Sequence, residues 1–342
     1  MKKYPLRSSI LLSSFSFIIS LLPQCTHSFA TQPSTQTPTS PSTIITPADI
    51  NFPILYENEH LLAISKPPHI PHHDDPQSNQ LGIISLLRHQ QQQQSSFSYP
   101  HRLYGVHRLD RVTSGILLLA KSSDIANTLV NKFKEREVTK YYMAISGKKP
   151  RKKKQGWVRG DMVLGRRGSY KLVNESKKED DGGKKSNYAV TRFFTAGLGN
   201  VPLSPSLLQE EVEGEEQVSS TTTPKTAILF QPHTGKTHQL RVAAKSVGLP
   251  ILGDARYGGG RVVRVGDDDT TTTEADYFDR TYLHAAAIQF EIDNEEVCIY
   301  SPPPFGHLFS TSSELDDVFV GMMKKHCESD SILHHVDGRS ML

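Results

Sequence analysis

The stretch VHRLDRVTSGILLLAK, residues 106–121, places one carboxylate, Asp110, between Arg108 and Arg111. A Thr-Ser-Gly turn and an apolar run follow directly. Most arginine–aspartate neighbours of this kind are solvated ion pairs on a surface and contribute little to stability. The run ILLLAK, however, has the composition of a buried strand, so Asp110 stands just before a core element. We therefore treat Asp110 as a candidate for chemistry.

The composition limits the classes of protein that this chain can belong to. It has 342 residues, 36% of them hydrophobic, and a formal net charge of +3. Several segments contain almost no apolar residues, so the folded part is smaller than the chain. The mild positive charge permits nucleic-acid binding without indicating it. Three widely separated cysteines, Cys25, Cys298 and Cys327, fit neither a disulfide framework nor a zinc site, and we expect no metal.

Residues 1–48 have the composition of a targeting presequence. A basic start, MKKYPLR, precedes the apolar run SILLSSFSFIISLL, as in secretory signals, and the run is short for a membrane span. The next segment is rich in hydroxyl residues and proline, and no acidic residue precedes Asp49, which is typical of organelle transit peptides.

This order resembles the bipartite presequences of algae with secondary plastids. We expect import into a plastid, with mitochondrial import or secretion as alternatives, and no membrane attachment of the mature form.

Ordered segments follow along the chain. ILYENEHLLAISKPP (54–68) predicts two strands around a turn, and LGIISLLRH predicts a short helix. GILLLAKS predicts a buried strand, SDIANTLVNKFKERE a helix capped by Ser123 or Asp124, and VTKYYMAISG another strand. The segment 225–258 predicts strand, turn, helix and loop, and RTYLHAAAIQFEI (280–292) predicts a further strand.

Low-complexity inserts interrupt a domain that we expect over residues 49–305. They lie near 89–98, 148–185, 199–224 and 262–279. The glutamine run Gln90–Gln94 predicts disorder. The lysine-rich 148–185 predicts a solvated loop or, alternatively, an arm that contacts phosphates, and its GRRG sequence fits a hairpin turn or a phosphate contact. The tail, 306–342, contains one amphipathic helical pattern.

A second group of candidate residues lies on the helix in 225–258. Thr237 is a suitable N-cap and Gly248 a suitable terminator. His238 and Arg241 fall along one edge of this helix, beside an apolar stripe. An arginine in this position will be partly buried and needs an anionic partner, because an unpaired buried charge costs about 3–5 kcal/mol. Asp110 is the candidate partner.

Four blocks, in this order, resemble the RluA-type pseudouridine synthases: HRLDRVTSGILLLAKS, KYYMAISG, HTGKTHQLRVAAKSVGLPILGDARYG and RTYLHAAAIQF. With the first strand pair they cover most of residues 52–305 apart from the inserts. The HRLD form distinguishes the chain from the RsuA-like branch, which usually has Gly-Arg-Leu-Asp. The resemblance implies a mixed α/β (α+β) catalytic domain, in which a bent, largely antiparallel sheet carries flanking helices and a basic cleft.

The resemblance also implies an activity: isomerisation of specific uridines in structured RNA, ribosomal or transfer RNA, to pseudouridine. The uracil leaves the ribose through N1–C1′ and rejoins it through C5, so no cofactor or metal is needed. Asp110 matches the essential aspartate, as a nucleophile or as the base of a glycal route. Arg241 supplies a guanidinium that favours its ionised form. Tyr142 matches the tyrosine that stacks on the uracil, and Tyr141 should face the other side of the strand.

Further residues are expected to bind the substrate. In relatives the arginine of HRLD, here Arg108, fills the space left by the flipped uridine, which partly offsets the lost stacking. Leu240 is expected to contact the base, and His107, His238 and Lys66 to contact RNA. Two positions depart from the family pattern: Ala243 stands where many relatives have histidine, and His69 where glycine is usual.

Other interpretations of single motifs are less specific. His69, His72 and His73 with Asp74 predict a polar loop rather than a metal cluster, because no second ligand group has a recognisable spacing. Thr113 and Ser114 predict a turn rather than a hydroxyl nucleophile.

Two rival functions remain open. A non-catalytic RNA-binding or chaperone module could retain the same fold. A hydrolase of glycosidic bonds would normally use two carboxylates, and no partner for Asp110 is evident. We expect the protein to be a monomer.

Overall fold

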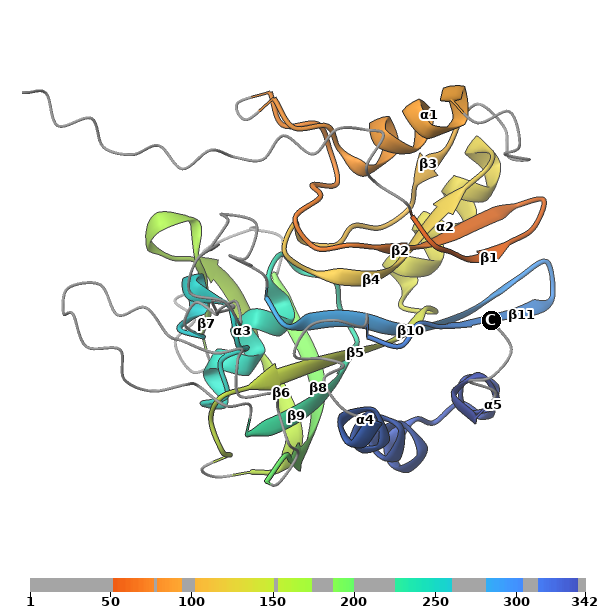
Figure 1. Cartoon of the computed structure of the whole chain (residues 1–342). Helices are drawn as coiled ribbons and strands as arrows, with labels where there is room; N and C mark the ends of the chain where they lie inside the picture. The colour runs from red at the N-terminus through yellow and green to blue at the C-terminus, as the bar shows by residue number, and fades with distance from the viewer. Residues whose placement is uncertain are drawn as a thin grey trace, which may run out of the picture. The chain divides into compact units, whose positions relative to one another are not determined.

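The apolar and alternating runs of the sequence form one sheet of eleven strands within the residues that the computed structural model describes (Figure 1). These are residues 52–76, 79–93, 102–150, 153–173, 187–199, 225–259, 281–303 and 313–337, and they belong to one compact unit. The predicted presequence and the insert 262–279 lie outside the described residues, as does nearly all of 199–224.

The strands lie in an order that differs from their order in the chain. Across the sheet they follow β1 (Ile54–Glu57), β2 (Leu61–Lys66), β4 (Ser114–Ala120), β10 (Leu283–Ile292), β5 (Thr139–Ser146), β9 (Thr226–Pro232), β8 (Tyr188–Gly197), β6 (Gln155–Leu164) and β7 (Tyr170–Val173), with β3 (Tyr104–Gly105) paired to β4 and β11 (Glu295–Tyr300) to β10. All described pairs are antiparallel except β4 with β10. The predicted mixed fold with a largely antiparallel sheet is confirmed.

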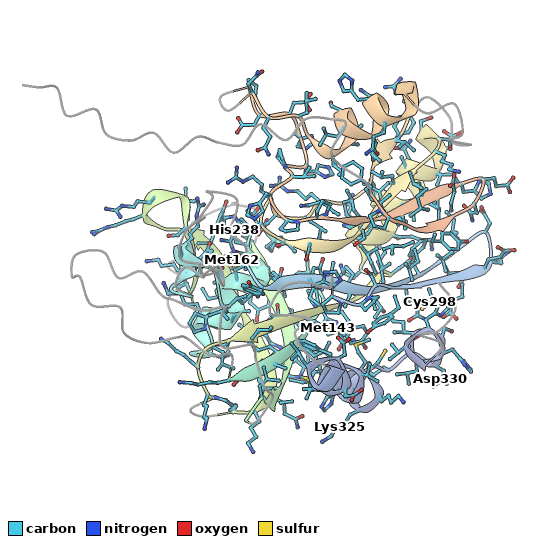
Figure 2. The ribbon with its side chains drawn as sticks, in the orientation of Figure 1. Met143, Met162, His238, Cys298, Lys325 and Asp330 are labelled. Carbon is cyan, nitrogen blue, oxygen red and sulfur yellow. The ribbon has the colours of Figure 1, made fainter. Side chains whose placement is uncertain are left out.

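Helices cover the sheet. They are α1 (Ile83–Gln93), α2 (Ser123–Glu135), α3 (Gln239–Ser246), α4 (Ser313–His326) and α5 (Asp330–Asp337). α2 packs on β3 and β4, α3 on β7 and β8, α4 on β8 and β9, and α5 on β11. Met143 and Cys298 lie in the core between the sheet and the last two helices (Figure 2). No helix in the described part of the chain is long and apolar enough to cross a membrane.

The position of β4 in the fold explains why its sequence is a continuous apolar run. Its residues are all buried. Leu117 and Leu119 join the cluster formed with α1, whereas Ile116, Leu118 and Ala120 join the cluster formed with α2. Because both faces of the strand are covered, no position favours a polar side chain. Each fully buried leucine or isoleucine stabilises the fold by about 1.5–3 kcal/mol.

The parallel contact between β4 and β10 depends on the glycine of the Thr-Ser-Gly turn. Gly115 has a φ of 109°, and a Cβ atom there would lie 2.3 Å from the backbone oxygen of Ala285. A larger residue would separate the two strands or strain the turn. Gly115 therefore fixes the loop that carries Asp110 against the centre of the sheet.

The two helix starts differ from the predictions by one or two residues. α2 is capped by Ser122, whose side chain accepts a hydrogen bond from the backbone N of Ile125, so the predicted cap at Ser123 or Asp124 is wrong. α3 begins after His238, which has a φ of 57°, so the cap predicted at Thr237 is also wrong.

The predicted end of α3 is confirmed. Gly248 has a φ of 77° and donates from its backbone N to Lys245 O at 3.0 Å, while Leu249 N donates to Ala244 O at 3.0 Å. These two bonds form a Schellman motif, which satisfies carbonyls that the end of a helix leaves without partners.

Three predictions about low-complexity segments need correction. Residues 155–173 of the predicted loop form the β6–β7 hairpin, because Val158 and Met162 supply a buried face; the hairpin turn at Arg166–Gly168 is confirmed. The glutamine run is helical as far as Gln93, which accords with the good helix propensity of glutamine. The tail contains two helices rather than one.

Candidate active site

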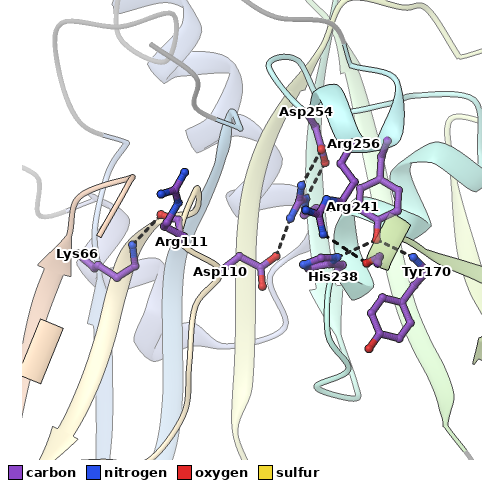
Figure 3. Close-up of polar contacts among 10 residues, drawn as sticks. Lys66, Asp110, Arg111, Tyr170, His238, Arg241, Asp254 and Arg256 are labelled. Atoms are coloured by element: carbon purple, nitrogen blue, oxygen red, sulfur yellow. Dashed lines mark hydrogen bonds and ion pairs between the residues drawn. The ribbon is translucent and has the colours of Figure 1, made fainter. Parts of the chain in front are cut away.

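The loop between β3 and β4 positions Asp110. The backbone N of Thr113 donates to the carbonyl of Asp110 at 3.0 Å, which confirms the predicted turn. Lys66, at the end of β2, donates from Nζ to Pro67 O at 2.8 Å and to Arg111 O at 3.2 Å (Figure 3). Lys66 has no exposed surface, so the prediction that it contacts RNA is wrong. It ties the Asp110 loop to the neighbouring strand instead.

Arg241 reaches Asp110 from α3, on the other side of the site (Figure 3). Its Nη1 lies 3.3 Å from Asp110 Oδ2. The Arg241 side chain is only 8% exposed, whereas that of Asp110 is 20% exposed. The predicted pairing of these two residues, 131 positions apart in the chain, is confirmed.

A second carboxylate, which the sequence analysis did not identify, holds the same guanidinium. Asp254 Oδ2 accepts from Arg241 Nε and Oδ1 accepts from Nη2, both at 2.7 Å. The Asp254 side chain is fully buried. Burial lowers the pKa of Arg241, but the hydrogen bonds and charge of Asp254, and then of Asp110, outweigh this effect and raise it above its ordinary value. The guanidinium is therefore fixed and permanently charged.

An aromatic residue supports Arg241 from behind. The Cζ atom of Arg241 lies 5.1 Å from the centre of the Tyr257 ring, a distance at which a cation and an aromatic face attract. The Tyr257 hydroxyl accepts from Tyr170 N at 3.0 Å and lies 2.8 Å from His238 Nδ1. Burial lowers the pKa of His238, so its ring is neutral at pH 7.

Tyr142 approaches the site from β5. Burial, and to a smaller extent the charge of Asp110, raises the pKa of its hydroxyl, so the phenol stays protonated. The neighbouring Tyr141 faces the other side of the sheet, where its hydroxyl accepts from Gln231 Nε2 and from Glu328 N, both at 3.2 Å. The predicted opposite orientation of the two tyrosines is confirmed.

Asp110, Tyr142, His238 and Arg241 line one cavity of about 520 Å³, within the range of ligand-binding pockets. Asp110 is the one carboxylate among the described residues of its lining. Leu240 and Tyr142 supply apolar surface. The basic side chains are Arg108, Lys134, Arg136, Lys140, Lys236 and Arg241. An excess of cations around a single carboxylate suits a polyanionic substrate.

His107 also lines the cavity, but one ring nitrogen serves the fold. Its Nε2 accepts from Leu118 N at 2.9 Å, and the ring stacks on Phe133 with centroids 4.9 Å apart. Burial lowers the pKa of His107 to about 3, so the ring is neutral. Its predicted contact with RNA stays a prediction.

In the loop that contains His69, His72 and His73, the neighbouring Asp74 has a structural role. Asp74 Oδ1 accepts from Gly82 N at 2.7 Å and Oδ2 accepts from Ser85 Oγ at 3.0 Å, at the start of α1. Among the described residues no group of three or more His, Cys, Asp or Glu side chains could hold a metal ion. His69, where relatives usually have glycine, has a φ of 71°, a conformation that favours glycine. Ala243, the other departure, is buried in the core.

Comparison with known proteins places these observations in a family. The family model of RNA pseudouridylate synthases matches residues 60–246, a range that includes Asp110, Tyr142 and Arg241. An uncharacterized RNA pseudouridine synthase of Haemophilus influenzae is 32% identical over 271 residues, covering 79% of this chain and 96% of that protein.

Other relatives carry RNA-specific names. The tRNA pseudouridine synthase C of Pasteurella multocida is 33% identical over 208 residues, 60% of this chain and 74% of that protein. The ribosomal large subunit pseudouridine synthase C of Vibrio parahaemolyticus is 30% identical over 279 residues, 81% of this chain and 71% of that protein. The solved structure of human RNA pseudouridylate synthase domain containing 1 is 23% identical with a TM-score of 0.49, covering 75% of this chain and 85% of that one.

Proposed function

This chain belongs to the RluA-type RNA pseudouridine synthases, which are isomerases, and we propose that Asp110 carries its reaction. One observation supports this assignment above the others. Asp110 is held by Arg241 at 3.3 Å and remains partly exposed in the cavity. The guanidinium gives the carboxylate a counter-charge at a fixed place, and the exposed part of the side chain can approach a nucleotide.

The reaction needs an ionised carboxylate because the uracil must be detached and reattached. The N1–C1′ bond breaks, a C5–C1′ bond forms, and the proton on C5 is lost while N1 gains one. Asp110 acts either as the nucleophile at C1′ or as the base of a glycal route. The product has the mass of the substrate, and no other reagent enters the balance.

Tyr142 and Arg241 complete the proposed catalytic group. Because the Tyr142 hydroxyl stays protonated, the side chain suits stacking on the uracil and hydrogen-bond donation better than proton abstraction as a phenolate. Arg241, fixed by Asp254, keeps the Asp110 charge in place while the base turns.

Four further residues are proposed to bind the flipped nucleotide. Arg108 is exposed beside Asp110 at the cavity, and its planar cation can replace the uridine in the stack. Leu240 offers apolar contact to the uracil, and the neutral rings of His107 and His238 offer hydrogen bonds at the cavity wall.

The proposed substrate is structured ribosomal or transfer RNA. The names of the relatives cover both classes, and the basic lining of the cavity suits either. From the presequence we propose action in a plastid, with the mitochondrion as the alternative, by a monomer that is not attached to a membrane in its mature form.

The test uses the purified full chain and total RNA. The proposal predicts pseudouridine in ribosomal or transfer RNA, detected as an isomer of unchanged mass. RNA that is bound without any pseudouridine would instead indicate a non-catalytic binding module, and free uracil would indicate a hydrolase. Mapping of pseudouridine with and without the gene, in separate organelle fractions, then identifies the site and the compartment.

A further inference from the structure

Trp157, the single tryptophan of the chain, is exposed on β6, outside the cavity. Its exposed fraction is 45%, although tryptophan is highly buried on average. Arg159 Cζ lies 4.7 Å and Arg192 Cζ 5.6 Å from its ring centre, and the His233 ring centroid lies 4.9 Å away. We call these four residues the Trp157 platform.

The register of three strands holds the platform together. Trp157 on β6 is paired with Arg192 on β8, and Arg159 is paired with Val190. The carbonyl of Val190 accepts from the backbone N of His233 at 2.9 Å. Side chains at paired positions lie on one face of a sheet, so the indole, the two guanidinium groups and the imidazole form a preorganised surface rather than a chance cluster.

The Trp157 platform lies on the face of the sheet opposite the cavity, because Arg192 is paired with Gln231, which bonds the hydroxyl of Tyr141. His233 lies in the chain between Pro232 and Thr234, which both line the cavity. Burial lowers the pKa of His233; the charge of Glu328 raises it, and the charges of Arg192, Lys140 and Arg136 lower it. An RNA that occupies both the cavity and the platform therefore extends from one face of the sheet to the other.

The charges around Trp157 suit a nucleic acid better than an apolar partner. Arg192 forms an ion pair with Glu328, whereas Arg159 has no ion pair with any carboxylate among the described residues. Lys153 and Lys154, at the start of β6, are both exposed. A flat aromatic surface beside several cations matches what single-stranded RNA requires, a stacking partner for its bases and counter-charges for its phosphates.

We propose that the Trp157 platform stacks an unpaired base of the substrate RNA, outside the segment whose uridine enters the cavity. This inference rests on the proposed function, because the stacked base belongs to the RNA whose uridine enters the cavity. The base lies against the indole, and Arg159 and the two lysines contact the backbone on either side. The platform then adds affinity that depends on an unpaired segment elsewhere in the substrate RNA.

The single tryptophan makes a direct test possible. The intrinsic fluorescence of the full chain is titrated with a single strand of about ten nucleotides, within the site sizes of single-strand binders, in which one uridine is flanked by adenines. Stacking on Trp157 predicts strong quenching by the single strand and little change with a duplex of the same length. Tight binding of the single strand with unchanged fluorescence would overturn the proposal.

Variants extend the test. Trp157→Ala should weaken binding of the single strand about tenfold, an expectation from the usual strength of base stacking, and Trp157→Phe should recover most of this loss because it keeps an aromatic face. Ile54→Ala, on β1, removes an apolar side chain of similar exposure, 42%, and should leave binding unchanged. Equal affinities of Trp157→Ala and the unmodified chain would refute the platform.

The result is separable from the catalytic proposal, because quenching measures binding alone. Quenching by a protein that forms no pseudouridine would keep the platform and reject the catalytic assignment. Pseudouridine formation without quenching would keep the assignment and reject the platform.

Discussion

Two carboxylates share one guanidinium, and their surroundings differ. Asp254 is fully buried and bonds Arg241 through both oxygens at 2.7 Å. Asp110 makes one longer contact, at 3.3 Å, and keeps part of its side chain exposed to the cavity. The first arrangement uses both oxygens of the carboxylate to hold Arg241, whereas the second leaves one oxygen available to a substrate.

The same division applies to neighbouring groups. Asp254, Tyr257 and Lys66 form what we call the support side, where polar atoms bond to other protein atoms. Asp110, Tyr142, Lys140 and Arg136 form the cavity side, where they line the cavity. Changes on the support side should alter stability first, and changes on the cavity side should alter RNA binding or turnover first.

Loss of Arg241 should produce the largest effect, because it belongs to both sides. Arg241→Met leaves the buried Asp254 without a counter-charge, and the free energy of unfolding should fall by about 3–5 kcal/mol. Pseudouridine formation should be lost as well. Urea denaturation and an isomerisation assay measure the two effects.

A matched control is Arg256→Met, in the short 3-10 helix Ala255–Tyr257 directly after Asp254. Arg256 is exposed and contacts the carbonyl of Gly168, so its replacement should change stability by no more than about 0.5 kcal/mol. Equal stability of the Arg241 and Arg256 variants would contradict the role given to the buried pair.

Asp254→Asn tests the support side alone. The variant should lose about 3 kcal/mol of stability, because a buried guanidinium then faces an uncharged amide. It should keep measurable activity, since Asp110 still pairs with Arg241. Asp293→Asn, on an exposed turn with 65% of its side chain accessible, serves as the control. An unchanged denaturation midpoint for Asp254→Asn would remove the contrast between the two carboxylates.

Lys140 gives the cavity side a pH dependence. Burial lowers the pKa of its amine from 10.5 to about 8. Above pH 8 the folded chain loses this charge while the unfolded chain keeps it. The contribution of Lys140 to the free energy of unfolding therefore increases as the pH rises from about 8 to 10.5. RNA binding should change in the opposite direction, because one counter-charge for phosphate is lost.

The salt dependence of RNA affinity measures this loss. The slope of log affinity against log salt concentration should become shallower by about one between pH 7 and pH 9. Lys140→Arg, which stays charged, should keep the same slope at both pH values. A pH-independent slope in the unmodified chain would show that Lys140 makes no phosphate contact.

The smallest effect is expected at Arg136, where the backbone conformation favours glycine but the charge of the side chain suits RNA binding. Arg136 ends α2 with a φ of 69°, a conformation that glycine adopts without strain, and it also lines the cavity. Arg136→Gly should therefore raise the free energy of unfolding by about 0.5–1 kcal/mol and weaken RNA binding. A gain in stability with full RNA affinity would indicate that this arginine does not serve the substrate.

The sequence predicted the parts of the fold whose pattern is local. The apolar run of β4, the helical spacing of α2 and the glycine that ends α3 all depend on neighbouring residues. The β6–β7 hairpin was missed because lysine clusters flank its short apolar face. The glutamine run was misjudged because composition indicates disorder, while packing of the preceding turns extends α1 into it.

The site was predictable where a motif carried it. Asp110 and Arg241 were matched through their motifs, and the structure brings them together. Asp254 lay within a quoted motif, but nothing in the order of residues indicates that its carboxylate is buried behind Arg241. Lys66 was predicted to contact RNA because it matches a lysine of the family's early strands; the sequence does not show that its acceptors are backbone carbonyls.

The most direct test of the central claim is a paired measurement on Asp110→Asn, of single-turnover pseudouridine formation and of urea denaturation. Because Arg241 keeps Asp254 as a partner, the stability of Asp110→Asn should lie within about 0.5 kcal/mol of that of the unmodified chain. The rate should fall by about 10³-fold or more, the scale of a lost catalytic group. Isomerisation at an undiminished rate, or a loss of stability as large as that of Asp254→Asn, would contradict the claim.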